Sequence, residues 1–133
     1  MNSDIKKIVK YWKELSDYDI TTAKFMLETK RFPYCLFMCH LSIEKLLKSL
    51  IVKFTKKHAP HSHNLIDLAK KTNIEFSEEN KMLLSDLTEF NLETRYPEWQ
   101  KKFYAKCSKK YTGDYFQKTQ KLQKWLKKYL LKK

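Results

Sequence analysis

Residues 33–54 read PYCLFMCHLSIEKLLKSLIVKF and make up the most apolar stretch of the chain. Apolar side chains recur in it every three or four residues, at Leu36, Cys39, Ile43, Leu47, Leu50 and Phe54. This spacing is typical of one face of an α-helix. Four further positions extend the apolar surface almost around the N-terminal half of the segment: Tyr34, Phe37, Met38 and Leu41. A helix that is apolar on nearly every side is expected at the centre of a bundle or at a subunit interface.

A narrow polar line interrupts this apolar helix. His40, Glu44 and Lys48 follow one another at four-residue intervals and therefore share one face. They could hydrogen-bond across the axis of a dimer or line a cleft. The alternative is an ordinary solvated face on which neighbouring turns pair their charges. The spacing alone leaves both interpretations open.

Helical periodicity continues on both sides of this segment. Residues 3–29 predict a long helix, with Ser3 or Asp4 as its N-cap. Its expected apolar face holds Ile5, Ile8, Trp12, Leu15, Tyr18, Thr22 and Met26. Pro33 suits the first turn of the central helix. Residues 63–73 predict a short helix that Ser62 caps, with apolar side chains at Leu65, Ile66, Leu68 and Ala69.

The C-terminal half predicts two more helices with a loop between them. The first begins at Ser77, which is spaced from Asn80 as an N-cap is from its partner, and it ends near Arg95. Residues 96–112 are aromatic and basic without a clear period, so we expect an irregular loop. The last helix begins at Gly113 and places on one face Phe116, Leu122, Trp125, Leu126 and Tyr129. Residues 1–133 therefore predict a single all-α domain, an up-and-down bundle of four to five helices.

Composition supports this fold class and excludes several kinds of site. The chain has one glycine and three prolines in 133 residues, whereas β-rich and α/β folds need more glycine turns. A single glycine also excludes a P-loop or a dinucleotide-binding fingerprint, since both need several glycines beside phosphate. No apolar run is long enough to span a membrane, and the N-terminus opens a polar helix rather than a signal peptide. We expect a cytoplasmic protein without membrane contact.

The cysteines and histidines do not predict a metal site. Cys35 and Cys39 lie in the apolar helix, which suits buried, reduced thiols in a reducing compartment. With His40 on the same helix they make a poor tetrahedral zinc set. The cluster HAPHSH at residues 58–63 lacks carboxylate or thiolate partners, and we expect His63 to pack against or cap the next helix. The sequence therefore predicts no metal and no cofactor.

The net charge of +13 predicts an acidic partner. Such a field attracts nucleic acid or an acidic protein, and it also keeps a small protein in solution. Only two of the 28 basic residues are arginines, Arg31 and Arg95, although arginine reads phosphate and bases better than lysine does. The composition favours non-specific RNA affinity over base-specific recognition.

A second polar network is expected between the first two helices. Asp19 is expected to form a structural ion pair inside the bundle rather than to carry out acid–base chemistry. Its candidate partners are Lys45 and Arg95. We place Glu44 in the same network.

The corner at Arg95, Tyr96 and Pro97 ends the fourth helix in an unusual way. Pro97 alone stops a helix, yet the chain places an arginine and a phenol directly before it. Arg95 either complements the helix dipole and bonds the last carbonyls, or binds an anion. Tyr96 either packs its ring or offers it to a base.

The order of several short segments points to a known family. An acidic–hydrophobic pair in residues 16–20 precedes Ala23, IEKLLKSLI stands at 43–51, HNL opens the third helix, and RYP follows the fourth. Across essentially the whole chain this order resembles the HEPN domain family of small bacterial and archaeal proteins. The resemblance implies an up-and-down helical bundle that dimerises. It also implies a minimal nucleotidyltransferase as partner, in a toxin–antitoxin or substrate-binding pair.

The resemblance also implies a catalytic alternative, because many members of the broader family are metal-independent endoribonucleases. Their signature is an arginine and a histidine with four to six residues between them, and two copies of the pair face one cleft. The corresponding positions after Arg95 hold Gln100, Lys101 and Lys102, and those after Arg31 hold Leu36, Phe37 and Met38. Imidazole suits proton transfer near neutral pH, which an arginine cannot perform as a base. The usual catalytic pair is therefore incomplete.

These observations favour binding over catalysis and leave enzymatic activity open. We expect a homodimer with Phe37 and Leu41 near its interface, acting as the nucleotide- or RNA-binding partner of a minimal nucleotidyltransferase. The phosphate-binding residues expected are Arg95, Tyr96, Lys45 and Lys48. If the protein is an enzyme, we expect an endoribonuclease that uses Arg95, Tyr96 or His40. A scaffold that only dimerises is the third interpretation, and the sequence names neither the ligand nor a toxin or antitoxin role.

Overall fold

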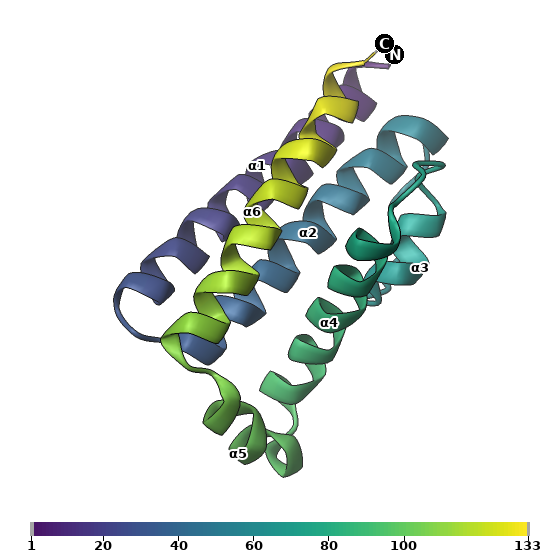
Figure 1. Cartoon of the computed structure of the whole chain (residues 1–133). Helices are drawn as coiled ribbons and strands as arrows, with labels where there is room; N and C mark the ends of the chain where they lie inside the picture. The colour runs from purple at the N-terminus through teal and green to yellow at the C-terminus, as the bar shows by residue number, and fades with distance from the viewer. Residues whose placement is uncertain (1, 133) are drawn as a thin grey trace.

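The apolar segment forms α2 (Phe32–Thr55), and all the other helices contact it. The computed structural model describes residues 2–132, and within that range there are six helices and no strand. The long helices α1 (Ser3–Glu28), α2, α4 (Glu78–Arg95) and α6 (Lys109–Leu131) alternate in direction along the chain. Both ends of the chain lie at one end of the bundle, and α5 (Pro97–Lys106) lies at the other (Figure 1). The expected all-α, up-and-down bundle is confirmed.

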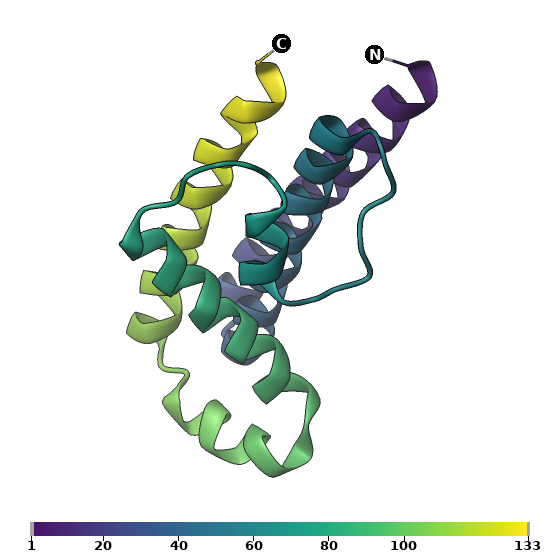
Figure 2. The same cartoon turned by 90° about the vertical axis from the view of Figure 1, so that its right-hand side faces the viewer.

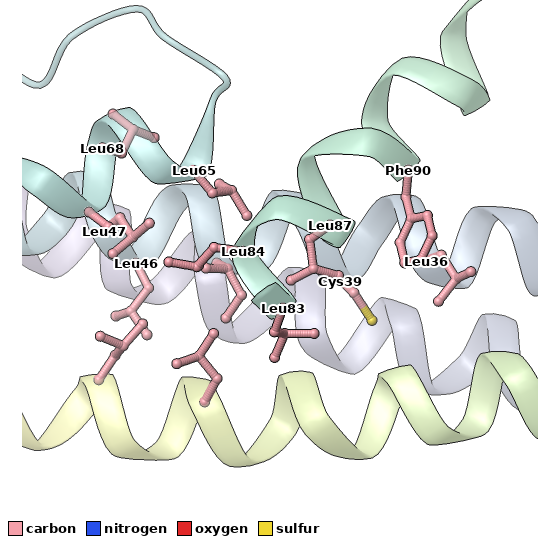
Figure 3. Close-up of a cluster of buried hydrophobic side chains, with 14 of the residues drawn as sticks. Leu36, Cys39, Leu46, Leu47, Leu65, Leu68, Leu83, Leu84, Leu87 and Phe90 are labelled. Carbon is pink, nitrogen blue, oxygen red and sulfur yellow. The ribbon is translucent and has the colours of Figure 1, made fainter. Parts of the chain in front are cut away.

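The core forms where α2 meets α3 (Leu65–Lys70) and α4. Figure 3 shows side chains of the three helices converging there, among them Leu36, Cys39, Leu46, Leu47, Leu65, Leu68, Leu83, Leu84, Leu87 and Phe90. Burying each leucine side chain contributes roughly 1.5–3 kcal/mol. The apolar helix was expected at the centre of a bundle or at a subunit interface, and it does lie at the centre of the bundle. No helix within residues 2–132 is long and apolar enough to cross a membrane.

The contact between α1 and α2 is made by small polar residues, which the sequence analysis did not single out. The buried residues of α1 are Ser16, Asp19 and Ala23. Ser16 Oγ donates to the Ser42 carbonyl at 2.7 Å, and Ser42 Oγ donates to the Ser16 carbonyl at 2.9 Å. Short side chains let the two backbones approach closely enough for these bonds. Tyr18, which was expected on the buried face, is 72% exposed, so that prediction is wrong.

The outer face of α1 carries exposed aromatic rings instead. Tyr11, Tyr18 and Phe25 are spaced by seven residues, lie along one side of the helix and are all exposed. Phe37 and Leu41 of α2 are half-buried. Exposed large apolar side chains of this kind are available for contact with a partner.

Residues 96–112 are helical for most of their length, so the expected loop is wrong. Pro97 starts α5, because a proline in the first turn needs no hydrogen-bond donor. Ser108 caps α6 by accepting from the N–H of Tyr111, so that α6 begins at Lys109 rather than at Gly113. α5 could not be predicted from the sequence, because the helix buries only Phe103 and its apolar residues therefore show no helical period. The described range thus has six helices instead of four to five.

Helix caps were predicted with mixed success. Asn2 caps α1 through its side chain, which accepts from the N–H of Asp4, and neither Ser3 nor Asp4 is the cap. Asn64 caps α3 in place of Ser62. Asn and Ser have similar capping strength, so neighbouring candidates cannot be ranked by residue type. The caps predicted at other helices hold: Ser77 accepts from the N–H of Asn80, and Pro33 lies in the first turn of α2.

Lys53 of α2 stabilises the C-terminal end of α6. Its Nζ donates to the carbonyls of Tyr129 at 2.7 Å and Leu130 at 2.9 Å, and also to that of Lys132. The last turn of a helix leaves carbonyls without intrahelical partners, and a positive charge there is favourable. Lys53 of α2 therefore fixes the C-terminal end of α6 against α2.

The central position of α2 predicts where the fold is most vulnerable. Leu46 is fully buried in α2, so Leu46→Ala should lower the free energy of unfolding by about 2–5 kcal/mol. Leu131→Ala is the matched control, because that side chain is 85% exposed, and its effect should stay below about 0.5 kcal/mol. Urea denaturation followed by circular dichroism measures both. Equal, small losses in the two variants would contradict the packing described.

Candidate functional site

The polar line of α2 is a buried network rather than a solvated face. His40, Glu44 and Lys48 are each buried, with Glu44 only 4% exposed. Lys48 Nζ donates to Glu44 Oε2 at 3.1 Å, and the ammonium lies 5.5 Å from the centre of the Trp12 ring. A buried carboxylate is tolerated only with partners that compensate its lost hydration. The solvated interpretation is therefore wrong, because the connection that follows α2 covers this face.

That connection brings His63 back to α2. Residues 56–64 leave the C-terminal end of α2 and run back alongside it before α3 begins (Figure 2). His63 Nδ1 lies 3.0 Å from Glu44 Oε1, while the side chain of His63 is 54% exposed. The imidazole of His63 is thus exposed to solvent, and the buried carboxylate of Glu44 fixes its position. The expectation that His63 packs against or caps the next helix did not include this contact. The signal in the sequence was the polar line of His40, Glu44 and Lys48 on an otherwise apolar helix, because a carboxylate there needs partners.

His40 holds the backbone of the same residue. Its Nε2 donates to the His63 carbonyl at 2.8 Å, and because a carbonyl only accepts, Nε2 carries the proton. Nδ1 of His40 is buried and has no hydrogen-bond partner among the described residues. Burial lowers the pKa of His40, and the charges of His63 and Arg95 lower it further, against the raising effects of the His63 carbonyl and Glu44. His40 is therefore a neutral structural anchor without access to solvent.

Arg95 lies at the exposed end of α4, close enough to His40 for its charge to act on that ring. Within residues 2–132, no carboxylate lies within 4.0 Å of its guanidinium. Asp19 pairs instead with Lys45, whose Nζ lies 2.5 Å from Asp19 Oδ2. Arg95 therefore keeps a positive charge without a carboxylate partner among the described residues.

Tyr96 sits at the turn between α4 and α5. Its N–H closes α4 by donating to the Leu92 carbonyl, and its own carbonyl accepts from the N–H of Trp99. The rings of Tyr96 and Trp99 meet edge to face, with centroids 5.5 Å apart. The ring of Tyr96 therefore lies outside the core, against the ring of Trp99 and next to Arg95 in the chain. Trp99 was not among the expected site residues, because it falls in the segment predicted to be a loop.

Chemically, the Arg95 corner offers a cation without a carboxylate partner among the described residues, and the connection after α2 offers the oriented imidazole of His63. Lys45 and Lys48, which were expected to bind phosphate, donate to Asp19 and Glu44 respectively. Among the described residues, no group of three His, Cys, Asp or Glu side chains is arranged to hold a metal ion. A separate groove of about 600 Å³ between α4 and α6 is lined by residues such as Asp86, Tyr115 and Trp125, and contains none of the expected site residues.

The burial of His40 predicts a loss of stability in mild acid. A histidine whose folded-state pKa lies below its ordinary value of 6.5 stabilises the fold fully above that value. The contribution is lost as the pH falls through the lowered pKa, because protonation then favours the unfolded chain. Urea midpoints should therefore fall between about pH 7.5 and about pH 5.5. His40→Gln, which keeps a donor for the His63 carbonyl but does not titrate, should flatten this dependence.

The control for that series is His61→Gln, at an exposed position of the same connection. It should keep the pH dependence of the unmodified protein. A His63→Asn background removes the neighbouring imidazole from the comparison. An unchanged pH dependence in His40→Gln would show that another group is responsible.

Comparison with known proteins agrees with this architecture. A family model described as HEPN domain matches residues 9–129, which is nearly the whole chain. Among solved structures, the crystal structure of TT1696 from Thermus thermophilus is similar, with a TM-score of 0.76 and 15% sequence identity. The match covers 91% of this chain and 97% of that one, and at this identity it shows the fold alone. No curated protein matches the sequence. The family match supports a function related to nucleotides or RNA, and it shows that the chain belongs to the HEPN domain family.

Proposed function

We propose that the protein is the nucleotide- or nucleic-acid-binding partner of a minimal nucleotidyltransferase, in a pair of the toxin–antitoxin type. Phosphate is held at the corner formed by Arg95 and Tyr96. The observation that carries the proposal is the guanidinium of Arg95, which is exposed and has no carboxylate partner within residues 2–132. A planar guanidinium without a counter-ion is suited to bidentate phosphate contacts.

The lysines of α2 support this corner indirectly. Lys48 neutralises Glu44, and Lys45 neutralises Asp19, so neither carboxylate repels an incoming phosphate. The remaining surface lysines add the net charge of +13, which attracts polyanions over distances of about 10 Å at moderate salt. The cysteines Cys35, Cys39 and Cys107 are free thiols, and the proposed place of action is the cytoplasm.

RNA cleavage is a second candidate function, and the bond between His63 and Glu44 favours it. The structure buries His40 and uses its Nε2 for the His63 carbonyl, which removes His40 from contact with an external substrate. The exposed ring of His63, oriented through Nδ1 by a carboxylate, has the geometry of a general base. His63 thus replaces His40 as the imidazole in this role, beside the other two expected residues, Arg95 and Tyr96.

We also propose that the protein forms a homodimer. Phe37 and Leu41 are half-buried on α2, on the helix that α1 covers on one side. Tyr11, Tyr18 and Phe25 add exposed aromatic surface on α1. Large apolar side chains of this kind dominate the buried centres of subunit interfaces.

The phosphate site predicts a specific loss in Arg95→Ala. The variant should bind a short single-stranded RNA about 10- to 100-fold more weakly at about 50 mM salt, because one charge-assisted contact is lost. Its melting temperature should stay close to that of the unmodified protein, because the side chain is exposed. Fluorescence anisotropy and thermal melts on the same samples measure both quantities.

Arg31→Ala is the matched control, since Arg31 is the other arginine and is also exposed. It should lose much less affinity than Arg95→Ala. Equal losses would assign the affinity to net charge, and a large drop in melting temperature would make Arg95 a structural residue. Gel analysis of the RNA after each titration tests the second candidate: shortening that disappears in His63→Asn would favour cleavage over binding.

The dimer predicts that Leu41→Glu is monomeric. A carboxylate in an apolar interface is strongly unfavourable, so light scattering should give the mass of one chain while circular dichroism remains helical. Leu131→Glu, at an exposed position of α6, should remain dimeric. If Leu41→Glu stays dimeric and Tyr18→Glu does not, the interface lies on the aromatic stripe of α1 instead.

A further inference from the structure

The end of the bundle at α5 has an unusual surface. Of the ten residues of α5 only Phe103 is buried, and its ring stacks on Phe90 of α4 with centroids 5.5 Å apart. The rest of the helix stands at the tip of the molecule, away from both termini (Figures 1 and 2). Phe103 is therefore the one side chain of α5 that enters the core, and Gln100 adds a hydrogen bond from its side chain to the Thr94 carbonyl. Most of the other side chains of α5 are exposed and can contact a partner.

The charges of this surface are nearly all positive. Residues 95–110 contain one arginine and five lysines, and Glu98 is their one acidic residue. Lys106 pairs with Glu93 of α4 at 3.4 Å. Lys101 and Lys102 are exposed, and no carboxylate of the described residues lies within 4.0 Å of either. Charge complementarity therefore requires a polyanion or a strongly acidic partner.

The aromatic rings on this surface are exposed but held in place. Tyr96 and Trp99 are each 46% exposed, and their rings lie 69° apart in orientation. The bond from the Trp99 N–H to the Tyr96 carbonyl, at 3.0 Å, and the fixed φ of Pro97 set the turn that carries both rings. A second exposed pair, Tyr34 of α2 and Tyr104 of α5, has centroids 6.5 Å apart. Rings that are already ordered lose little entropy when a ligand stacks on them.

We propose that Tyr96 and Trp99, flanked by Arg95, Lys101 and Lys102, form a stacking surface for the unpaired bases of a single-stranded nucleic acid. The inference rests on the proposed function and names its ligand class. Aromatic faces bind bases of any identity, and unpaired cations bind the backbone between them. A duplex stacks its base faces on one another and leaves none for an aromatic ring. An acidic protein could bury the same rings, but the run of cations before and after them in the chain matches the repeating phosphates of a strand whose bases are unpaired. The combination therefore favours single strands over both alternatives.

The test compares three ligands on the full chain: a single-stranded RNA of about ten nucleotides, the DNA of the same sequence, and a duplex of equal length. Trp99→Leu should bind both single strands about tenfold more weakly, with little change for the duplex. Trp99→Phe keeps a ring and should restore most of the affinity. Phe54→Leu is the matched control, because Phe54 is 38% exposed in the last turn of α2, at the end of the bundle away from α5, and should not affect binding (Figure 1). Circular dichroism confirms that each variant is folded.

The possible failures are distinguishable. If Trp99→Leu binds all three ligands as the unmodified protein does, while Arg95→Ala still loses affinity, the stacking surface is refuted and the phosphate corner survives. If Trp99→Leu loses the same affinity for the single strands and for the duplex, stacking is also refuted, because the protein would then recognise only the charge of the ligand. If the unmodified protein binds no nucleic acid and no mononucleotide at about 50 mM salt, both proposals fail. A preference between RNA and DNA identifies which single strand is the ligand.

Discussion

The burial of α2 is the constraint on which the rest of the structure depends. A helix that is apolar on nearly every side can be removed from water only if other elements cover it all round, and the other five helices of the described range contact it. Polar groups on the covered faces of α2 are then buried or half-buried as well, and must find their partners inside the protein. Ser42 finds its partner in Ser16 of α1, and Lys53 finds its partners at the end of α6.

The same constraint produces the candidate site. Glu44 is the acidic residue of α2, and Lys48 and His63 together compensate its burial. His40, one turn earlier, binds the His63 carbonyl. His40 and Glu44 of α2 therefore fix the backbone and the ring of His63, which lies in the connection between α2 and α3. An imidazole held in this way keeps its orientation while remaining exposed, which is what proton transfer or phosphate binding requires.

Asp19, Glu44 and Glu93 each pair with a lysine. Arg95 has no carboxylate partner among the described residues, and it lies at the corner that leads into α5, where Lys101 and Lys102 are also exposed and unpaired with a carboxylate. The proposed phosphate contact at Arg95 and the proposed stacking at Trp99 would therefore be neighbouring properties of one end of the bundle.

The sequence by itself determined the features that depend on local physics. Apolar spacing located the long helices and the central role of residues 33–54, and Ser77 and Pro33 marked helix starts through contacts within one turn. Tertiary structure decided everything that depends on which elements meet. α5 buries Phe103 alone and so leaves no periodic signal in the sequence. Tyr18 is exposed because small serines let α1 approach α2 on another face. Likewise His63 joins Glu44 across 19 residues of chain, a contact that becomes favourable only once α2 is buried and its carboxylate needs a partner.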